Sequence, residues 1–234
     1  MPRSKEQNKI IRDGKIDQIL DTALSQYVMY GYNGTDMDTI AESAEVSKGL
    51  LYYYFKTKNV LFKELFNIMM AKTSSYSDNF FNKVEGMNPV DKLVKYSLGI
   101  FGMGFEDPRY IQFAMRMPFD AFAVFGANGW REGLEGSKKH NSNLEKIITE
   151  GMDNGYMRCT NAKEGANSFW TVYVAALFNF TKMTGSKSNK LNKAGYEEGL
   201  ENLLAFGMSG LGVDEALWKK SLAKCIREET NESI

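Results

Sequence analysis

Three tyrosines and a group of lysines between residues 47 and 63 carry side chains suited to binding a polyanion. Tyr52, Tyr53 and Tyr54 are consecutive, and the segment from Ser47 to Lys63 contains four lysines and no acidic residue. Phenol hydroxyls, ammonium groups and the free amides at the start of a helix all bind phosphate oxygens. Side chains on an exposed helix also reach base edges in the major groove of DNA. The segment therefore has side chains of the kind that contact duplex DNA.

Helical spacing gives this segment two different faces. Leu51 and Phe55 lie four residues apart on one side, and Ser47 is a candidate N-cap. The opposite side carries Gly49, Tyr52, Tyr53 and Lys56. One interpretation is a DNA-recognition helix held to the protein by its two apolar residues. The alternative is an aromatic-rich helical hairpin packed inside a bundle, and spacing and charge alone leave both open.

Two further helices are expected to position this one. Thr35-Asp36-Met37-Asp38 has the form of a capping box, in which the Thr35 hydroxyl takes a backbone amide and Asp38 reaches back to Thr35. The apolar residues that follow at helical spacing are Met37, Ile40, Ala41 and Ala44. Upstream, an apolar stripe predicts a helix over about 8–30 that ends at Gly31 with a left-handed C-cap.

The spacing of small, aromatic and apolar residues across 23–62 is specific. The residues concerned are Ala23, Tyr27, Gly31, Tyr32, Thr35, Ile40, Ala41, Val46, Ser47, Gly49, Leu51, Tyr52, Tyr54, Phe55, Lys58 and Leu61. In these residues the stretch resembles the DNA-binding domain of the TetR family of transcriptional regulators. Two positions depart from the family pattern: Glu45 stands where Gly is usual, and Met37 stands where Thr or Ser is common.

The resemblance implies an all-α fold with two domains. Residues 1–56 would form a three-helix helix-turn-helix DNA-binding domain, and residues 57–234 a helical bundle for ligand binding and dimerisation. A dimer would then place two recognition helices in successive major grooves of a near-palindromic operator. Base edges would be met by Gly49, Leu50 and Tyr53. Phosphates would be held by Thr35, Ser47, Lys48, Tyr52 and Lys58.

Composition is that of an ordinary globular protein, with 43% apolar residues, 25% charged residues and no net charge. The isolated cysteines Cys159 and Cys225 and the single His140 exclude a four-ligand zinc site, and no cofactor is expected. The longest apolar run, 169–180, is shorter than the ~18–20 residues of a membrane span, so we expect no membrane partner. With a charged N-terminus, the chain is expected to be cytoplasmic.

The N-terminal arm is locally basic. It carries Arg3, Lys5, Lys9, Arg12 and Lys15 against Glu6 and Asp13. Such arms are often solvated and disordered, and we expect this of residues 1 to about 8.

Aromatic residues and methionines are concentrated between Phe101 and Trp130. A helical core absorbs many of them, but the group lies where proteins that resemble TetR form an effector pocket. Aromatic and methionine side chains suit a flat or cationic hydrophobic ligand. The candidate ligand-binding residues are Phe101, Phe105, Phe113, Met117, Phe119, Phe122, Trp130, Trp170 and Tyr173. The glycine-rich segment 126–136 predicts a flexible loop beside them.

The remaining pattern predicts helices at about 58–81, 90–105, 137–154, 162–183, 196–207 and 213–229, with a further helix starting at Pro108. The helix at 162–183 is apolar nearly all round and must be covered. We expect a homodimer through the helices at about 162–183 and 196–207, as the resemblance implies and as C2 symmetry makes common.

Together these features predict a ligand-responsive transcriptional regulator, a repressor released from its operator by a small hydrophobic or aromatic effector. An enzyme is disfavoured because the sequence contains no GxSxG, HExxH, GxGxxG or Walker A pattern and has one histidine. The alternative that stays open is a helical interaction protein of the same fold that has lost DNA binding. Glu45 and the zero net charge support that alternative.

Overall fold

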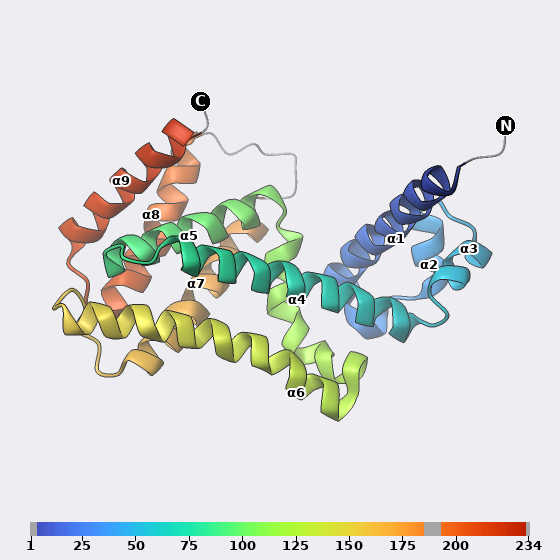
Figure 1. The fold of residues 1–234 in the computed structure, drawn as a ribbon, viewed down its shortest axis with the longest axis horizontal. Coiled ribbons are helices and arrows are strands. Elements are labelled where there is room, and N and C mark those ends of the chain that lie inside the picture. Colours follow the sequence, from blue (N-terminus) through green and yellow to red (C-terminus); the bar gives the residue numbers. More distant parts are fainter. Residues whose placement is uncertain (1–3, 185–192, 233–234) are drawn as a thin grey trace. The chain divides into compact units, whose positions relative to one another are not determined.

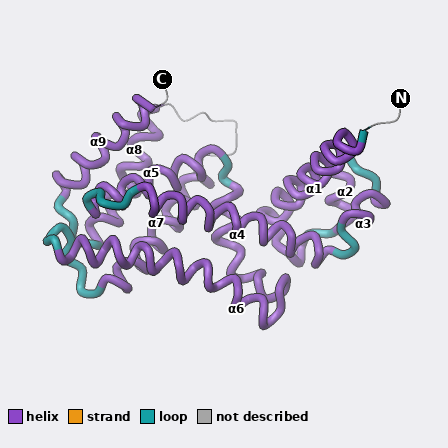
Figure 2. The backbone as a smooth tube through the Cα atoms, viewed as in Figure 1, coloured by secondary structure: helices purple, strands orange, loops and turns teal. Residues whose placement is uncertain are grey.

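The computed structural model describes residues 4–184 and 193–232, with side chains described there except at 127–139, 182–184, 193, 194, 196 and 229–232. In these ranges the chain is helical and contains no strand, which confirms the all-α prediction (Figures 1 and 2). The helices are α1 (Lys5–Gly34), α2 (Met37–Ser43), α3 (Lys48–Tyr54), α4 (Lys58–Lys83), α5 (Pro89–Glu106), α6 (Arg109–Asp153), α7 (Ala162–Thr184), α8 (Lys193–Gly210) and α9 (Glu215–Glu232). None of the helices described is long and apolar enough to cross a membrane.

The chain forms two compact units. Unit 1 comprises Met1–Lys72 and Gln112–Gly133, and unit 2 comprises Thr73–Ile111 and Leu134–Ile234. Helices α4 and α6 each contribute residues to both units. The functional domain boundary expected after residue 56 stays a prediction.

Helix α1 starts earlier than its sequence predicts. Ser4 caps it with a complete capping box, in which the Ser4 hydroxyl accepts from the Gln7 amide and the Gln7 side chain accepts from the Ser4 amide. The expectation of a disordered segment up to residue 8 is therefore wrong from Lys5 onward. The buried stripe of α1 comprises Ile19, Leu20, Ala23, Leu24 and Tyr27.

Gly31 interrupts α1 close to its end. Its backbone has φ 72° and ψ 179°, so the positive φ expected of a glycine is present, but the helix resumes and runs to Gly34. The Arg116 guanidinium fills the space beside this glycine, because a Cβ at residue 31 would lie 2.4 Å from Arg116 Nη2. Arg116 also lies 3.4 Å from Asp120 Oδ2. The bend in α1 thus packs against the part of α6 that belongs to unit 1.

The core of unit 1 is aromatic and draws on distant parts of the chain. The Tyr27 ring lies 5.2 Å from Phe66 and 5.4 Å from Phe113. Phe66 in turn contacts Phe113 and Phe125 at 4.9 and 5.7 Å between centroids. Such edge-to-face pairs stabilise by about 0.5–1.5 kcal/mol beyond their burial. Burial of Tyr27 raises the pKa of its phenol.

Unit 2 is a bundle in which α5 packs against α9 and α7 packs against α8. Asp91 in the first turn of α5 accepts hydrogen bonds from Ser221 Oγ at 2.6 Å and Lys224 Nζ at 2.7 Å, which ties α5 to α9. The Phe101 ring of α5 lies 5.2 Å from Phe180 of α7. The amphipathic stripes of these helices bury one another, as their apolar periodicity requires.

Helix α6 corrects one sequence prediction. The segment 126–136, expected to be a loop, is helical except at Gly126, where φ is 72° and ψ is −175°. The expected helix at 137–154 is therefore the last part of a longer helix. A mid-helix glycine costs only about 1 kcal/mol relative to alanine, so the glycines after Gly126 do not end this helix, which is kinked at Gly126 itself.

Candidate nucleic-acid interface

The helix-turn-helix begins one residue later than its capping pattern predicts. Asp36 is the N-cap of α2, and its carboxylate accepts from the Thr39 amide at 2.9 Å and from the Thr39 hydroxyl at 2.6 Å. These hydrogen bonds lower the pKa of Asp36. Thr35, predicted to cap this helix and to hold a phosphate, is buried and donates its hydroxyl to the Gly31 carbonyl at 2.7 Å. Thr35 therefore serves the end of α1 and is not available to a ligand as folded.

A tight turn joins α2 to α3. Glu45 has φ 50°, and among the residues that the structure describes it is the only one other than glycine with a positive φ. The Val46 amide donates to the Ala41 carbonyl at 3.0 Å, which closes the turn over the end of α2. Glutamate thus adopts the left-handed conformation for which glycine is better suited. The sequence identifies this position correctly as one where glycine is missing.

Helix α3 presents two chemically different faces. Leu51 and Phe55 are buried, at 0% and 5% exposure, whereas Tyr52 and Tyr53 are 42% and 69% exposed. This is the orientation that the 3.6-residue period predicts. Leu50 is half-buried on the flank. No element of the described chain covers the aromatic face of α3, so this face is accessible to a partner molecule.

The start of α3 is open as well. The Ser47 side chain accepts from the Leu50 amide at 3.2 Å, and because a hydroxyl is also a donor, its proton stays available to an acceptor outside. Gly49 is exposed, and apart from its chain neighbours and the backbone of its own helix nothing lies within 4 Å of the position a Cβ would take. A phosphate or a base edge can approach the backbone closely at this point.

Two predicted phosphate-binding lysines already have partners. Lys48 Nζ lies 2.6 Å from Asp38 Oδ2 on the surface, and this hydrogen bond raises the pKa of Lys48. Lys58 Nζ lies 4.6 Å from the centroid of the Tyr32 ring and 3.5 Å from the Asn33 carbonyl. Partial burial lowers the pKa of Lys58. An exposed ion pair is worth little in water, so Lys48 can exchange Asp38 for a phosphate.

The candidate effector residues do not form one cluster within either unit. Five of them fall in the residue ranges of unit 1, where Phe113 is buried in the core and Met117 is half-buried. Phe119 and Phe122 are 85% and 62% exposed, so as folded they line no buried pocket. Trp130 lies outside the residues whose side chains are described.

The other four belong to unit 2. Phe101 and Tyr173 are buried, and the Tyr173 hydroxyl donates to the Ser97 carbonyl. Phe105 lies at the surface with 36% exposure. Trp170 is half-buried, and its indole lies 4.3 Å from the His140 ring and 6.0 Å from Tyr96. Of this group, Trp170 has the ring neighbours that form a mixed polar and aromatic site.

Sequence reasoning missed the cluster around His140. The Tyr96 hydroxyl lies 3.2 Å from His140 Nδ1, and Ser77 Oγ lies 3.5 Å from the same nitrogen. Phe81 and Trp170 cover the two rings. Burial lowers the pKa of His140 to about 4 and raises that of Tyr96. The signal available in the sequence was that the chain's one histidine lies on a helix that follows a segment rich in aromatic residues.

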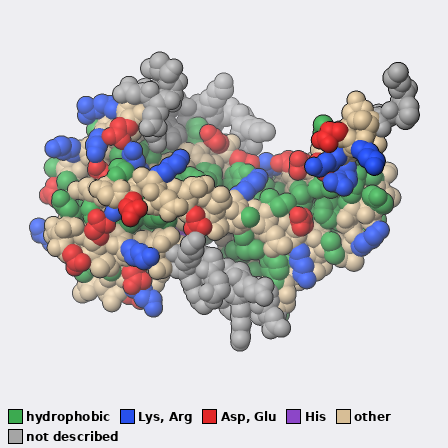
Figure 3. All heavy atoms as spheres, in the orientation of Figure 1, with side chains coloured by type: hydrophobic (Ala, Val, Ile, Leu, Met, Phe, Trp, Pro, Cys, Tyr) green, Lys and Arg blue, Asp and Glu red, His purple; other side chains and the backbone are tan. Residues whose placement is uncertain are grey.

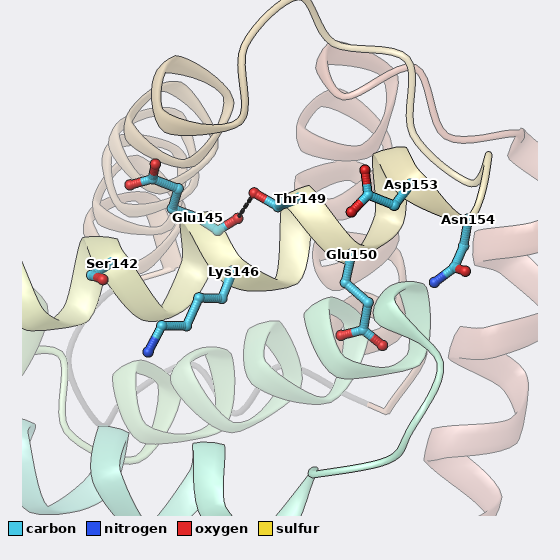
Figure 4. Close-up of a pocket in the computed structure, with 7 residues that line it drawn as sticks. All are labelled: Ser142, Glu145, Lys146, Thr149, Glu150, Asp153 and Asn154. Atoms are coloured by element: carbon cyan, nitrogen blue, oxygen red, sulfur yellow. Dashed lines mark hydrogen bonds between the residues drawn. The ribbon is translucent and has the colours of Figure 1, made fainter.

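The surface depression drawn in Figure 4 is polar and lies along one face of α6. Its lining is Ser142, Glu145, Lys146, Thr149, Glu150, Asp153 and Asn154. Thr149 donates to the Glu145 carbonyl at 2.9 Å, and Glu150 is paired with Lys92 of α5 at 2.6 Å. The residues described hold no group of acids, histidines or cysteines placed to bind a metal ion. This face suits solvent better than a hydrophobic effector.

A shallow groove runs between α7 and α8, the helices predicted to dimerise. Its apolar lining includes Phe169, Val172 and Phe206, and Phe206 is 68% exposed. Gly165, Gly207 and Gly210 also line the groove, and having no side chains they leave the helix backbones accessible there. An exposed phenylalanine beside small residues forms an apolar surface that a helix of another protomer can approach closely.

Comparison with known proteins gives consistent results. The sequence model described as "Bacterial regulatory proteins, tetR family" matches residues 19–65. The uncharacterized HTH-type transcriptional regulator YhgD of Bacillus subtilis (strain 168) is 26% identical over 165 residues, which is 70% of this chain and 83% of YhgD. The HTH-type transcriptional regulator QacR of Staphylococcus aureus (strain Mu50 / ATCC 700699) is 46% identical over 56 residues, which is 24% of this chain and 30% of QacR.

Solved structures show the same fold. The transcriptional regulator FadR of Bacillus subtilis, in complex with stearoyl-CoA, superposes with a TM-score of 0.59 at 19% identity and covers 82% of this chain and 97% of its own. YhgD, QacR and FadR are all transcriptional regulators by name.

Proposed function

Because the chain belongs to the TetR family of helix-turn-helix transcriptional regulators, we propose that it is a repressor that binds a near-palindromic operator as a homodimer. A small hydrophobic or aromatic effector releases it from DNA. The proposed place of action is the cytoplasm, where the operator lies. The observation that carries this proposal is the exposed Tyr52 and Tyr53 face of α3, anchored by buried Leu51 and Phe55.

The roles proposed at the interface follow from exposure and chemistry. Gly49, Leu50 and Tyr53 meet base edges, since they lie on the outer face or flank of α3. Ser47, Lys48, Tyr52 and Lys58 bind phosphates and set the docking angle. Thr35 acts indirectly, because its buried hydroxyl holds the end of α1 in place beside α2.

The proposed DNA binding is tested by selecting duplexes from a random pool and measuring affinity at several salt concentrations. A repressor enriches a near-palindrome with half-sites about one helical turn apart and loses affinity steeply as salt rises. A helical interaction protein of the same fold enriches no sequence and binds duplex DNA without a steep salt slope. Exposed tyrosines and the uncovered start of α3 favour the repressor over this alternative.

The proposed dimer uses α7 and α8. A C2 interface would bring the groove and exposed Phe206 of each protomer against the other. Phe206→Glu places a charge at the centre of that surface and should convert the dimer to a monomer in sedimentation velocity. Val60→Glu is a matched control, because Val60 is also exposed but lies in unit 1. A variant at Phe206 that stays dimeric would refute this interface.

The proposed effector site lies in unit 2, between α4, α5, α6 and α7. Support comes from the half-buried Trp170 indole, the Phe81 ring and the polar atoms of Tyr96, His140 and Ser77. An apolar ligand would take the place of some contacts between these aromatic rings, and the polar atoms of Tyr96, His140 and Ser77 would orient it. The effector acts only if it binds one dimer geometry better than the other.

Fluorescence of Trp170 tests this site directly. A long-chain acyl thioester is one probe, since a structural neighbour is in complex with stearoyl-CoA, and a flat aromatic cation is the other. Saturable quenching that disappears in Trp170→Phe supports the site. Quenching that persists in Trp170→Phe and disappears in Trp218→Phe would place the ligand in another part of the chain. If a compound that releases the protein from DNA does not quench the fluorescence at all, the proposed location is refuted.

A further inference from the structure

Helix α1 continues well beyond the core of unit 1. It begins at Lys5, whereas its first buried residue is Ile19. At about 1.5 Å per residue, these fourteen residues add a rod of about 21 Å. The Ser4 capping box fixes the start of this rod. The extension is thus a formed helix with little protein around it.

The basic residues of this extension continue the buried stripe of α1. Ile16, Ile19 and Ala23 are spaced by three and four residues on the side that packs onto the rest of unit 1. The same spacing, taken toward the N-terminus, meets Arg12, Lys9 and Lys5. Residues three and four apart share one face of a helix. The apolar stripe therefore becomes a basic stripe where the covering helices end.

Helix α2 of the helix-turn-helix packs against α1. Helix α2 starts just after the end of α1, and Ser43 at its other end accepts a hydrogen bond from Gln26 Nε2 at 3.3 Å. Helix α2 thus runs back along α1, and the following turn and the start of α3 lie toward the N-terminal half of α1 (Figure 1). The basic stripe lies on the part of α1 that precedes Gln26, the residue that meets the end of α2.

These cations are available to a partner. Lys5, Lys9 and Arg12 are exposed, and within the described residues Lys5 and Lys9 have no ion pair. Arg12 is paired with its neighbour Asp13 at 3.0 Å, and both side chains are about half exposed. Such a pair is easily exchanged. Figure 3 shows Lys and Arg side chains gathered near the N-terminal end of α1.

We propose that the first turns of α1 form a second DNA-contacting element, in which Lys5, Lys9 and Arg12 bind backbone phosphates that flank the segment met by α3. This inference rests on the proposed function and extends its footprint. The contact carries no sequence information, because phosphates are the same at every step. A helix formed before binding holds the three cations at a fixed spacing, so little conformational entropy is lost when DNA arrives.

The test compares two triple variants with the same change of charge. The first is Lys5→Gln, Lys9→Gln and Arg12→Gln, which keeps good helix formers in α1. The control is Lys146→Gln, Lys163→Gln and Lys220→Gln, three exposed cations of unit 2. Affinity for the selected duplex is measured from 50 to 200 mM salt, with helicity checked by circular dichroism.

The salt dependence gives the size of the effect. Each lost phosphate contact lowers the slope of log affinity against log salt by about 0.9, so three contacts lower it by about 2.7 per bound protomer. Over this fourfold range of salt, the variant should lose about 40-fold less affinity per protomer than the wild type. The loss of affinity should be the same on cognate and random duplexes.

Each other outcome overturns the inference. A wild type that binds steeply while the α1 variant keeps its slope refutes this element and leaves the proposed function standing. A wild type that binds no duplex refutes both. An equal drop in the unit 2 control would show an effect of net charge alone. A different partner would be indicated if the wild type binds phosphatidylglycerol vesicles, the α1 variant does not, and the salt slope of DNA binding is the same for both. The stripe would then be assigned to an anionic lipid surface.

Discussion

Replacing His140 should remove a pH dependence of folding stability that the wild-type protein has between pH 7 and pH 5. Burial lowers the pKa of this imidazole to about 4 in the folded protein. In the unfolded chain the pKa returns to about 6.5. Between these two pKa values the imidazole is protonated in the unfolded chain and neutral in the folded protein. The stability that the neutral histidine contributes is therefore present above pH 6.5 and is lost as the pH falls toward 4.

The two pKa values set the magnitude. The full difference of about 2.5 pH units corresponds to about 3 kcal/mol, of which about 2 kcal/mol is lost by pH 5. The groups that face the imidazole are Ser77 from α4, Tyr96 from α5 and Trp170 from α7. Each of these is uncharged near neutral pH, which leaves burial as the cause of the shift.

Urea unfolding at pH 7, 6, 5.5 and 5 measures this loss. His140→Gln keeps a polar side chain that does not titrate in this range, so the difference between the two slopes isolates His140. Because the chain has one histidine, its imidazole proton resonances also report the folded pKa directly. Parallel stability curves for the two proteins, or an imidazole that titrates near 6.5 while folded, would refute the buried, neutral histidine.

Three further changes test the helix-turn-helix. Tyr53→Ala should weaken binding to the cognate duplex by about 1–3 kcal/mol and to random duplex by less, and equal losses would remove Tyr53 from base contact. Lys58→Ala should weaken binding to every sequence and reduce the salt slope by about one unit, so an unchanged slope contradicts its phosphate role. Glu45→Gly should raise the unfolding free energy by up to about 1 kcal/mol by relieving a left-handed φ, and a lower melting temperature would contradict this.

Periodicity predicted the faces of α3 because burial depends on a geometric repeat that every helix obeys. Leu51 and Phe55 are buried and Tyr52 and Tyr53 exposed, as the spacing indicates. The cap of α2 was placed one residue too early, since Thr35 and Asp36 are both good caps. Only the bend at Gly31, which brings a free carbonyl to the Thr35 hydroxyl, decides between them.

For the candidate effector residues, the number of aromatic side chains in a segment does not predict which of them are buried. Phe113 and Phe119 are six residues apart on α6, yet one is buried and the other is 85% exposed. The His140 cluster joins four helices, so no local pattern announces it. Segment 126–136 was predicted as a loop from its glycines, although a helix tolerates isolated glycines at a modest cost.

The aromatic core of unit 1 has a consequence for how the protein is made. Tyr27 and Phe66 are covered by Phe113 and Phe125, which a ribosome adds long after the helix-turn-helix itself. A nascent chain that ends at residue 72 holds every candidate DNA-contacting residue but lacks Phe113 and Phe125 against these rings. The aromatic core behind the DNA-contacting helices is therefore complete only when more than half of the chain has been synthesised.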